Sequence, residues 1–136
     1  MAINKFVETQ KMYIDVVKDD LTSGKKKNHW IWFIFPQLKG LGKSQVSQYF
    51  GIKDMDEARE YYKEPILKKN LDDCFKIVLK YKDYNALSDC FGTLDTKKVH
   101  SCATLFYLST KKPIFKKFLD KFFNGLLDEQ TVILLS

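Results

Sequence analysis

Apolar residues recur at the spacing of an α-helix along most of this chain, and this periodicity limits the fold more than any other feature of the sequence. Residues 4–21 are a clear case, with lysines and aspartates opposite an apolar side formed by Phe6, Val7, Tyr13, Ile14, Val17 and Leu21. The 136 residues include only six glycines and three prolines, which is little material for the many turns of a β-sandwich. The sequence therefore predicts an all-α protein.

Turn and capping residues divide the periodic pattern into about seven short helices. Gly24 is a left-handed stop for the first helix, and Asp54 followed by Glu57 is typical of a capping box before a helix that runs to Tyr62. The further starts that we predict are Pro65, Asn85, Asp95, Pro113 and Asp128, and the further stops are Gly92 and Asn124-Gly125. No linker or internal repeat interrupts the chain, so we predict one compact multihelical domain over residues 1–136.

Composition predicts a cytoplasmic protein without a membrane segment, a metal or a cofactor. The longest apolar run, Trp30 to Phe35, is far shorter than the roughly 20 residues that cross a bilayer. The three cysteines, Cys74, Cys90 and Cys102, form no CxxC pair, and their odd number does not suit a disulfide framework. Neither histidine has close cysteine or histidine neighbours, so the sequence predicts no zinc site.

The charge of the chain is unevenly distributed. The formal net charge is +6, and the stretch from Leu21 to Lys53 contains six lysines and no acid. Arg59 is the only arginine, which argues against the bidentate contacts that proteins make to bases and phosphates in nucleic acids. Nucleic-acid binding is therefore the least favoured alternative. A protein-interaction module that uses the lysine-rich stretch remains an alternative.

Residues 25–44 form the most unusual segment. Trp30, Trp32, Phe33 and Phe35 place four large aromatics within six residues, and rings of this size are expected to face the core as a central buried helix. Gly42-Lys43-Ser44 is similar to the end of a phosphate-binding P-loop. That motif needs a glycine where this chain has Gln37, and it needs a preceding strand, so we reject an NTPase.

Two groups of polar residues suggest a site for a small anionic ligand, phosphorylated or nucleotide-like. The candidate ligand-binding residues are Trp30, Trp32, Gln37, Lys43 and Ser44 in the aromatic segment, and Asp95, Lys98, Ser101 and Thr104 on a later helix. The lysines would supply charge, the hydroxyls and helix N-terminus would donate hydrogen bonds, and a tryptophan would stack on a ring.

His29 is the candidate group for proton transfer, because a histidine titrates nearest to neutral pH. No nucleophile with a partner base is evident from spacing, so the sequence leaves open whether the protein is an enzyme. The alternative for the polar residues is an internal network in which Asp95 caps a helix and Lys98 pairs with Asp95 or with Asp128.

Residues 29–44, HWIWFIFPQLKGLGKS, resemble a family of small, all-α, mostly bacterial proteins of unknown function with the pattern HW-x-W-F-x-FPQ and then GLG-x-S. Further blocks that resemble this family lie at residues 57–61, 65–67, 91–106 and 122–131. The chain departs from the family at Glu64, where a His is common, and at Leu94 and Thr96, which replace a Pro and an Asp.

The resemblance implies a multihelical single domain and no established reaction. Members of this family are sometimes labelled calpastatin, the name of a protease inhibitor. Inhibitors of that kind are long, flexible and proline-rich, whereas this chain is aromatic and periodic, so its physical properties do not support the label.

Overall fold

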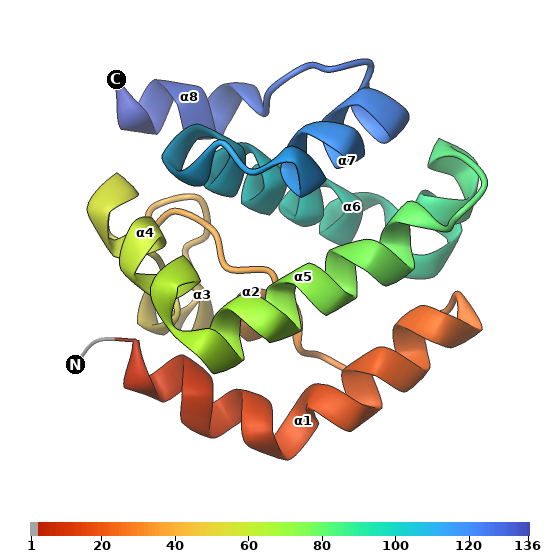
Figure 1. Cartoon of the computed structure of the whole chain (residues 1–136), viewed down its shortest axis with the longest axis horizontal. Coiled ribbons are helices and arrows are strands. Elements are labelled where there is room, and N and C mark those ends of the chain that lie inside the picture. Colours follow the sequence, from red (N-terminus) through yellow and green to blue (C-terminus); the bar gives the residue numbers. More distant parts are fainter. Residues whose placement is uncertain (1–2) are drawn as a thin grey trace.

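The computed structural model describes residues 3–136 and confirms the all-α prediction (Figure 1). The helices are α1 (Asn4–Ser23), α2 (Ile31–Ile34), α3 (Gln45–Tyr49), α4 (Met55–Lys63), α5 (Pro65–Leu79), α6 (Tyr84–Thr110), α7 (Pro113–Phe123) and α8 (Glu129–Leu135). Helix α5 packs between α1 and α7, while α6 contacts α4, α7 and α8. Within residues 3–136, no helix has the length and apolar character needed to cross a membrane.

Local capping signals correctly predict several helix boundaries. Gly24 ends α1 in the left-handed conformation, with φ of 76°. Asp54 accepts a hydrogen bond from the Glu57 amide at 2.9 Å at the start of α4, and Asp128 accepts one from the Thr131 amide at 3.0 Å at the start of α8. These side chains satisfy backbone donors that the first turn of a helix leaves without partners.

In α6 one predicted cap is wrong, whereas the predicted break is present. The cap is Asp83 rather than Asn85, because the Asp83 carboxylate accepts a hydrogen bond from the Ala86 amide at 3.0 Å. Gly92 breaks the helical path within α6, as predicted: its φ of 81° and ψ of 166° lie in a region open essentially only to glycine, and helical structure resumes directly afterwards. The range of α6 thus spans two of the predicted helices, joined across the kink at Gly92, and the structure adds the short helix α3.

Asp95 is not the helix cap that the sequence predicts. It lies within α6, after the bend, and its carboxylate contacts two lysine side chains. Thr96 lies beside it, and its hydroxyl donates a hydrogen bond of 2.6 Å to the Gly92 carbonyl. The hydroxyl of Thr96 thus has a structural role at the bend.

An aromatic core joins the segment of residues 25–44 to the helices. Phe35 meets Phe75 of α5 edge-on at 5.2 Å between ring centroids, and Phe75 meets Phe115 of α7 in the same way at 5.2 Å. Trp30 and Phe35 are fully buried, as predicted for most of these rings. The predicted central helix is only the single turn α2.

Gln10 of α1 holds α2 in place through a buried polar contact. Its side-chain nitrogen donates to the Phe33 carbonyl at 2.7 Å and to the Tyr61 hydroxyl at 2.9 Å, and its oxygen accepts from Asn70 at 2.9 Å. Because every polar atom of this buried amide has a partner, it fixes the position of α2 instead of weakening the core.

Candidate functional site

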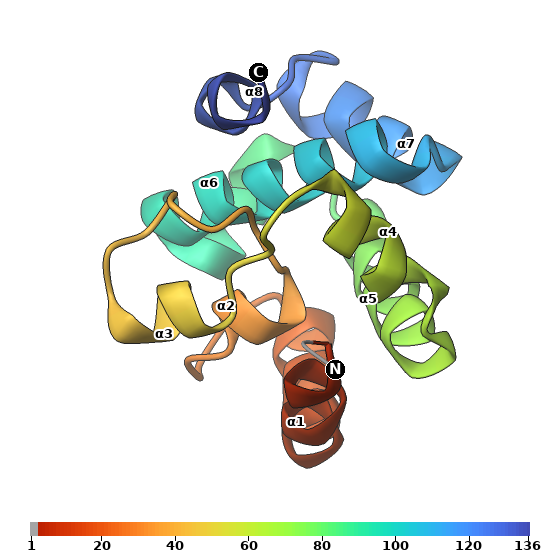
Figure 2. The same ribbon diagram turned by 90° about the vertical axis from the view of Figure 1, so that its left-hand side faces the viewer.

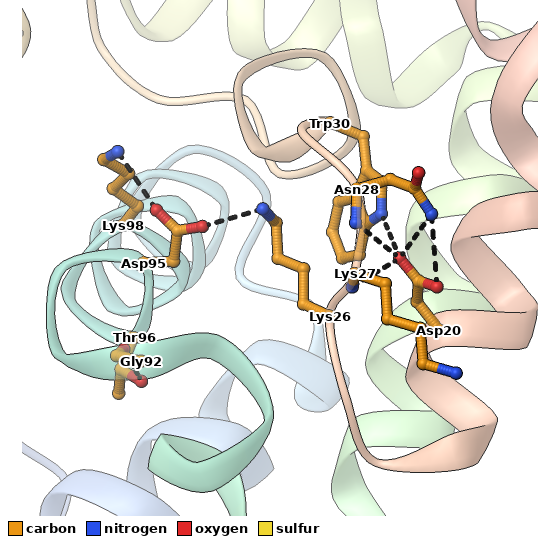
Figure 3. A network of polar contacts seen from close by, with 9 residues as sticks. All are labelled: Asp20, Lys26, Lys27, Asn28, Trp30, Gly92, Asp95, Thr96 and Lys98. Atoms are coloured by element: carbon orange, nitrogen blue, oxygen red, sulfur yellow. Dashed lines mark hydrogen bonds and ion pairs between the residues drawn. The ribbon is translucent and has the colours of Figure 1, made fainter.

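Asp20, at the end of α1, shapes the backbone that leads into the aromatic segment. One oxygen of its carboxylate accepts from the Lys27 amide at 3.0 Å, the Asn28 amide at 3.2 Å and the Trp30 indole at 2.9 Å (Figure 3). Burial raises the pKa of Asp20, but the hydrogen bonds from Trp30, Lys27 and Asn28 outweigh this effect and hold the pKa below its ordinary value. The charged form of Asp20 therefore fixes the path of residues 27–30.

Asp95 joins the same segment to α6. Its carboxylate lies between Lys26 Nζ at 3.0 Å and Lys98 Nζ at 3.1 Å (Figure 3). The side chain of Lys26 is only 8% exposed, and its backbone amide donates to the Cys90 carbonyl at 2.9 Å. Burial raises the pKa of Asp95, but the two lysines more than offset this and keep the pKa low.

Two cavities lie where residues 25–44 meet α6, and Trp32 and Lys98 line both of them. The first has a volume of about 280 Å³ and is also lined by Lys26, His29, Trp30, Ile31, Phe33, Val46 and Asp95. The second has a volume of about 290 Å³ and is also lined by Gln37, Leu41, Gly42, Leu94, Lys97, Ser101, Asp128 and Gln130. We call them the first and second Trp32 cavities.

The Trp32 ring lies between the Lys98 ammonium and the backbone at Gly42. Lys98 Nζ lies over its ring, 5.0 Å from the centroid, which is a favourable arrangement for a cation and an indole. A Cβ atom at Gly42 would lie 2.7 Å from the Trp32 ring and 2.7 Å from the Ser47 side chain. Glycine is therefore required at position 42 if the ring is to keep this position.

Six of the sequence-predicted ligand residues and His29 line these cavities. His29, Trp30 and Asp95 line the first, Gln37 and Ser101 line the second, and Trp32 and Lys98 line both. The two polar groups predicted from the sequence thus meet in space. His29 is exposed at the first cavity.

Lys43, Ser44 and Thr104 line neither cavity. Lys43 is exposed, and Ser44 caps α3 by accepting from the Ser47 amide at 3.1 Å. Thr104 is fully buried, where its hydroxyl donates to the His100 carbonyl at 2.9 Å and accepts from the Asp128 amide at 2.8 Å. The latter two side chains have structural partners, as the alternative of an internal network expects.

That alternative also fits Lys98, which pairs with Asp95 and not with Asp128. The Asp128 carboxylate instead accepts from the Thr131 amide and hydroxyl. Lys26 was missed by the sequence reasoning because nothing in the run Lys25-Lys26-Lys27 distinguishes the lysine that turns inward.

The arrangement is suited to binding anions more than to nucleophilic catalysis. Around the first cavity, two lysines face one carboxylate, which leaves one positive charge in excess. Cys74, Cys90 and Cys102 are all buried, and burial raises the pKa of each thiol, that of Cys74 to about 12. Residues 3–136 contain no group of three or more metal-ligating side chains placed to hold a metal ion.

The sequence matches a family of proteins of unknown function over almost its whole length. The chain belongs to the family described as "Protein of unknown function (DUF1810)", which matches residues 1–135. This membership confirms the predicted resemblance to a family of unknown function, and neither comparison gives the name calpastatin.

A solved structure shares the whole fold. The crystal structure of the conserved hypothetical protein Rv1873 from Mycobacterium tuberculosis is 34% identical in sequence and superimposes with a TM-score of 0.92. The match covers 98% of this chain and 95% of that chain. A comparison with curated proteins finds no match.

Proposed function

We propose that this protein binds a small anionic molecule, phosphorylated or nucleotide-like, in the Trp32 cavities. The observation that carries the proposal is the position of Lys98, whose ammonium lies over the Trp32 ring and lines both cavities. An ammonium has three N–H donors, and one of those of Lys98 is used by Asp95. The remaining donors are free to meet an anion while the indole stacks against a ring.

Lys26 strengthens this argument because it neutralises Asp95 from the buried side. Its Nζ lies 3.0 Å from one carboxylate oxygen, while Lys98 is bound to the other. Because Lys26 and Lys98 share the single negative charge of Asp95, one positive charge remains in excess beside the cavity. An anion placed beside Lys98 would be attracted by the excess charge in a site that is partly shielded from water.

The cavity volumes bear on the size of the ligand. Each Trp32 cavity, at about 280 and 290 Å³, lies just below the usual range of ligand sites. A nucleotide-like molecule would extend across both cavities along Trp32. His29, at the first cavity, is then the residue that would transfer a proton to or from such a ligand.

The test is a thermal-shift and tryptophan-fluorescence panel of nucleotides, sugar phosphates and ADP-ribose-like compounds. A ligand at 100 times its dissociation constant adds about 2.7 kcal/mol to the free energy of unfolding, which raises Tm by several degrees. We expect Lys98→Gln to weaken a hit about tenfold. The control Lys76→Gln, at an exposed lysine of α5, should leave affinity unchanged. A panel without hits, or equal binding by wild type and Lys98→Gln, would overturn the proposal.

Protein binding is a second candidate function, and exposed apolar residues of α8 favour it. Ile133 is 55% exposed and Leu134 is 46% exposed, and the preceding Leu126 is 67% exposed. Exposed apolar side chains within one short stretch of chain favour an interaction surface. If this surface binds a partner, the wild-type protein will retain that partner on affinity beads, and Leu134→Glu will not.

A further inference from the structure

A third cavity, separate from the Trp32 cavities, has the largest volume of the three, about 420 Å³. Residues of α4, the first turn of α5, the end of α6 and the α6–α7 connection line it, and none of them lines a Trp32 cavity. In Figure 2, α4 and α5 lie on the right of the molecule, while α2 and α3 lie on the left. We call this the α4–α7 cavity.

Its wall carries four cations and no carboxylate, namely Arg59, Lys63, Lys68 and Lys112. Arg59 is paired with Asp56 at 2.8 Å and Lys68 with Asp72 at 3.0 Å. Lys63 and Lys112 form no ion pair with any of the residues 3–136. The cavity therefore keeps an excess of positive charge even after both neighbouring aspartates are counted.

A buried hydroxyl without a partner also lines this cavity. Ser109 is only 6% exposed, and its Oγ is the one buried side-chain polar atom in residues 3–136 without a hydrogen-bond partner. Four other hydroxyls of α6, on Thr96, Ser101, Thr104 and Thr110, donate to the carbonyl four residues earlier. Because a buried hydroxyl without a partner is destabilising, a ligand group that accepted a hydrogen bond from Ser109 would remove this cost.

The helix ends around the cavity add to its positive potential. Lys112 and Pro113 begin α7, and no side chain caps this end, so the positive end of the helix dipole is not neutralised. The carbonyls at the end of α6 would repel an anion, but Arg59 Nε donates to the Ser109 carbonyl at 2.9 Å. Arg59 thus reduces the negative potential near the cavity and keeps part of its guanidinium for a ligand.

We infer that the α4–α7 cavity binds the phosphate group of a small phosphorylated molecule. A phosphate carries up to two charges and several acceptor oxygens, which suits four cations with a free hydroxyl. The volume lies within the range of sites for small organic ligands, which favours a phosphate ester over inorganic phosphate. Tyr62 lines the cavity and supplies part of its wall for the organic part, and its hydroxyl donates to Asp72 at 2.6 Å.

The experiment is an NMR titration of backbone amides at constant ionic strength, with phenyl phosphate, inorganic phosphate and sodium chloride as separate probes. We expect phenyl phosphate to shift the amide signals near residues 59–63 and 109–115. It should bind there more tightly than inorganic phosphate, and sodium chloride should not shift these signals. Equal or tighter binding of inorganic phosphate would contradict the inference that the ligand is a phosphate ester. Shifts confined to residues 29–44 would contradict the assignment of the ligand to the α4–α7 cavity.

Matched variants separate specific binding from general attraction. Lys63→Gln/Lys112→Gln should weaken phenyl phosphate binding about tenfold or more. The control Lys11→Gln/Lys76→Gln removes the same charge from exposed positions of α1 and α5 and should change binding less than about twofold. Equal weakening by both pairs would overturn the inference.

Two single variants complete the test. Ser109→Ala should weaken binding about fivefold while Tm stays the same or rises, because it removes a buried hydroxyl without a partner. Unchanged binding would exclude a contact between Ser109 and the phosphate. Lys98→Gln should not affect this titration, whereas it should abolish or weaken binding in the Trp32 cavities, so the two proposals fail separately.

Discussion

The buried contact between Asp20 and the Trp30 indole should contribute measurably to stability. The indole nitrogen donates at 2.9 Å, and Asp20 and Trp30 are 4% and 1% exposed. A double-mutant cycle with Asp20→Asn and Trp30→Phe isolates this contact, because losses of packing and of other hydrogen bonds occur in both arms of the cycle.

The expected coupling free energy between the two positions follows from the charge of the Asp20 acceptor. A hydrogen bond to a charged group contributes about 1.5–3 kcal/mol. Asn at position 20 would keep one acceptor oxygen for the amides of Lys27 and Asn28, so part of the network survives. We therefore expect a coupling free energy of about 1–2 kcal/mol between the two positions. Asp20→Asn alone should lower the free energy of unfolding by about 2 kcal/mol.

Urea unfolding of the four proteins at neutral pH measures this coupling. Additivity within about 0.5 kcal/mol would refute the conclusion that the contact holds residues 27–30.

The contact should also depend on pH. The pKa of Asp20 is lowered in the folded protein, so its contribution is complete above about pH 5 and is lost as the pH falls through this lowered pKa, below about pH 4. A wild-type stability that does not decline more steeply than that of Asp20→Asn in this acid range would contradict the assignment.

Three further predictions follow from local geometry. Gly92→Ala should destabilise the protein by about 1–3 kcal/mol through backbone strain alone, since no atom lies within 4 Å of the new Cβ; an unchanged urea midpoint would contradict this. Gly42→Ala should shift the Trp32 emission and lower Tm, because the new Cβ meets the indole at 2.7 Å; an unchanged emission spectrum would contradict the close approach. Cys74 and Cys102 should react with a thiol reagent only on unfolding; rapid labelling of the folded protein would show that they are accessible.

The features that the sequence could predict depend on residues close together in the chain. The cap at Asp54 and the starts of α5 at Pro65 and α7 at Pro113 need only the next few residues, so their signals are visible in the sequence. Asn85 and Asp83 are both good capping residues two positions apart, and propensity alone does not decide between them.

The features that the sequence could not predict depend on distant partners. Asp95 has the residue type of a cap, but Lys26 reaches it from a segment 69 residues earlier and makes it an ion-pair partner instead. The contact between Trp32 and Lys98 likewise joins two residues that are far apart in the sequence. Lys43 and Ser44 are polar residues of the same segment as Gln37, but they lie outside both Trp32 cavities, where Lys43 is exposed and Ser44 caps α3.

A crystal structure of the protein with the strongest binder from the ligand panel tests the central claim most directly. We predict that the ligand lies against the Trp32 ring, with its anionic group within hydrogen-bond distance of Lys98 Nζ. A ligand bound elsewhere, with both Trp32 cavities empty at a saturating concentration, would contradict the proposed function.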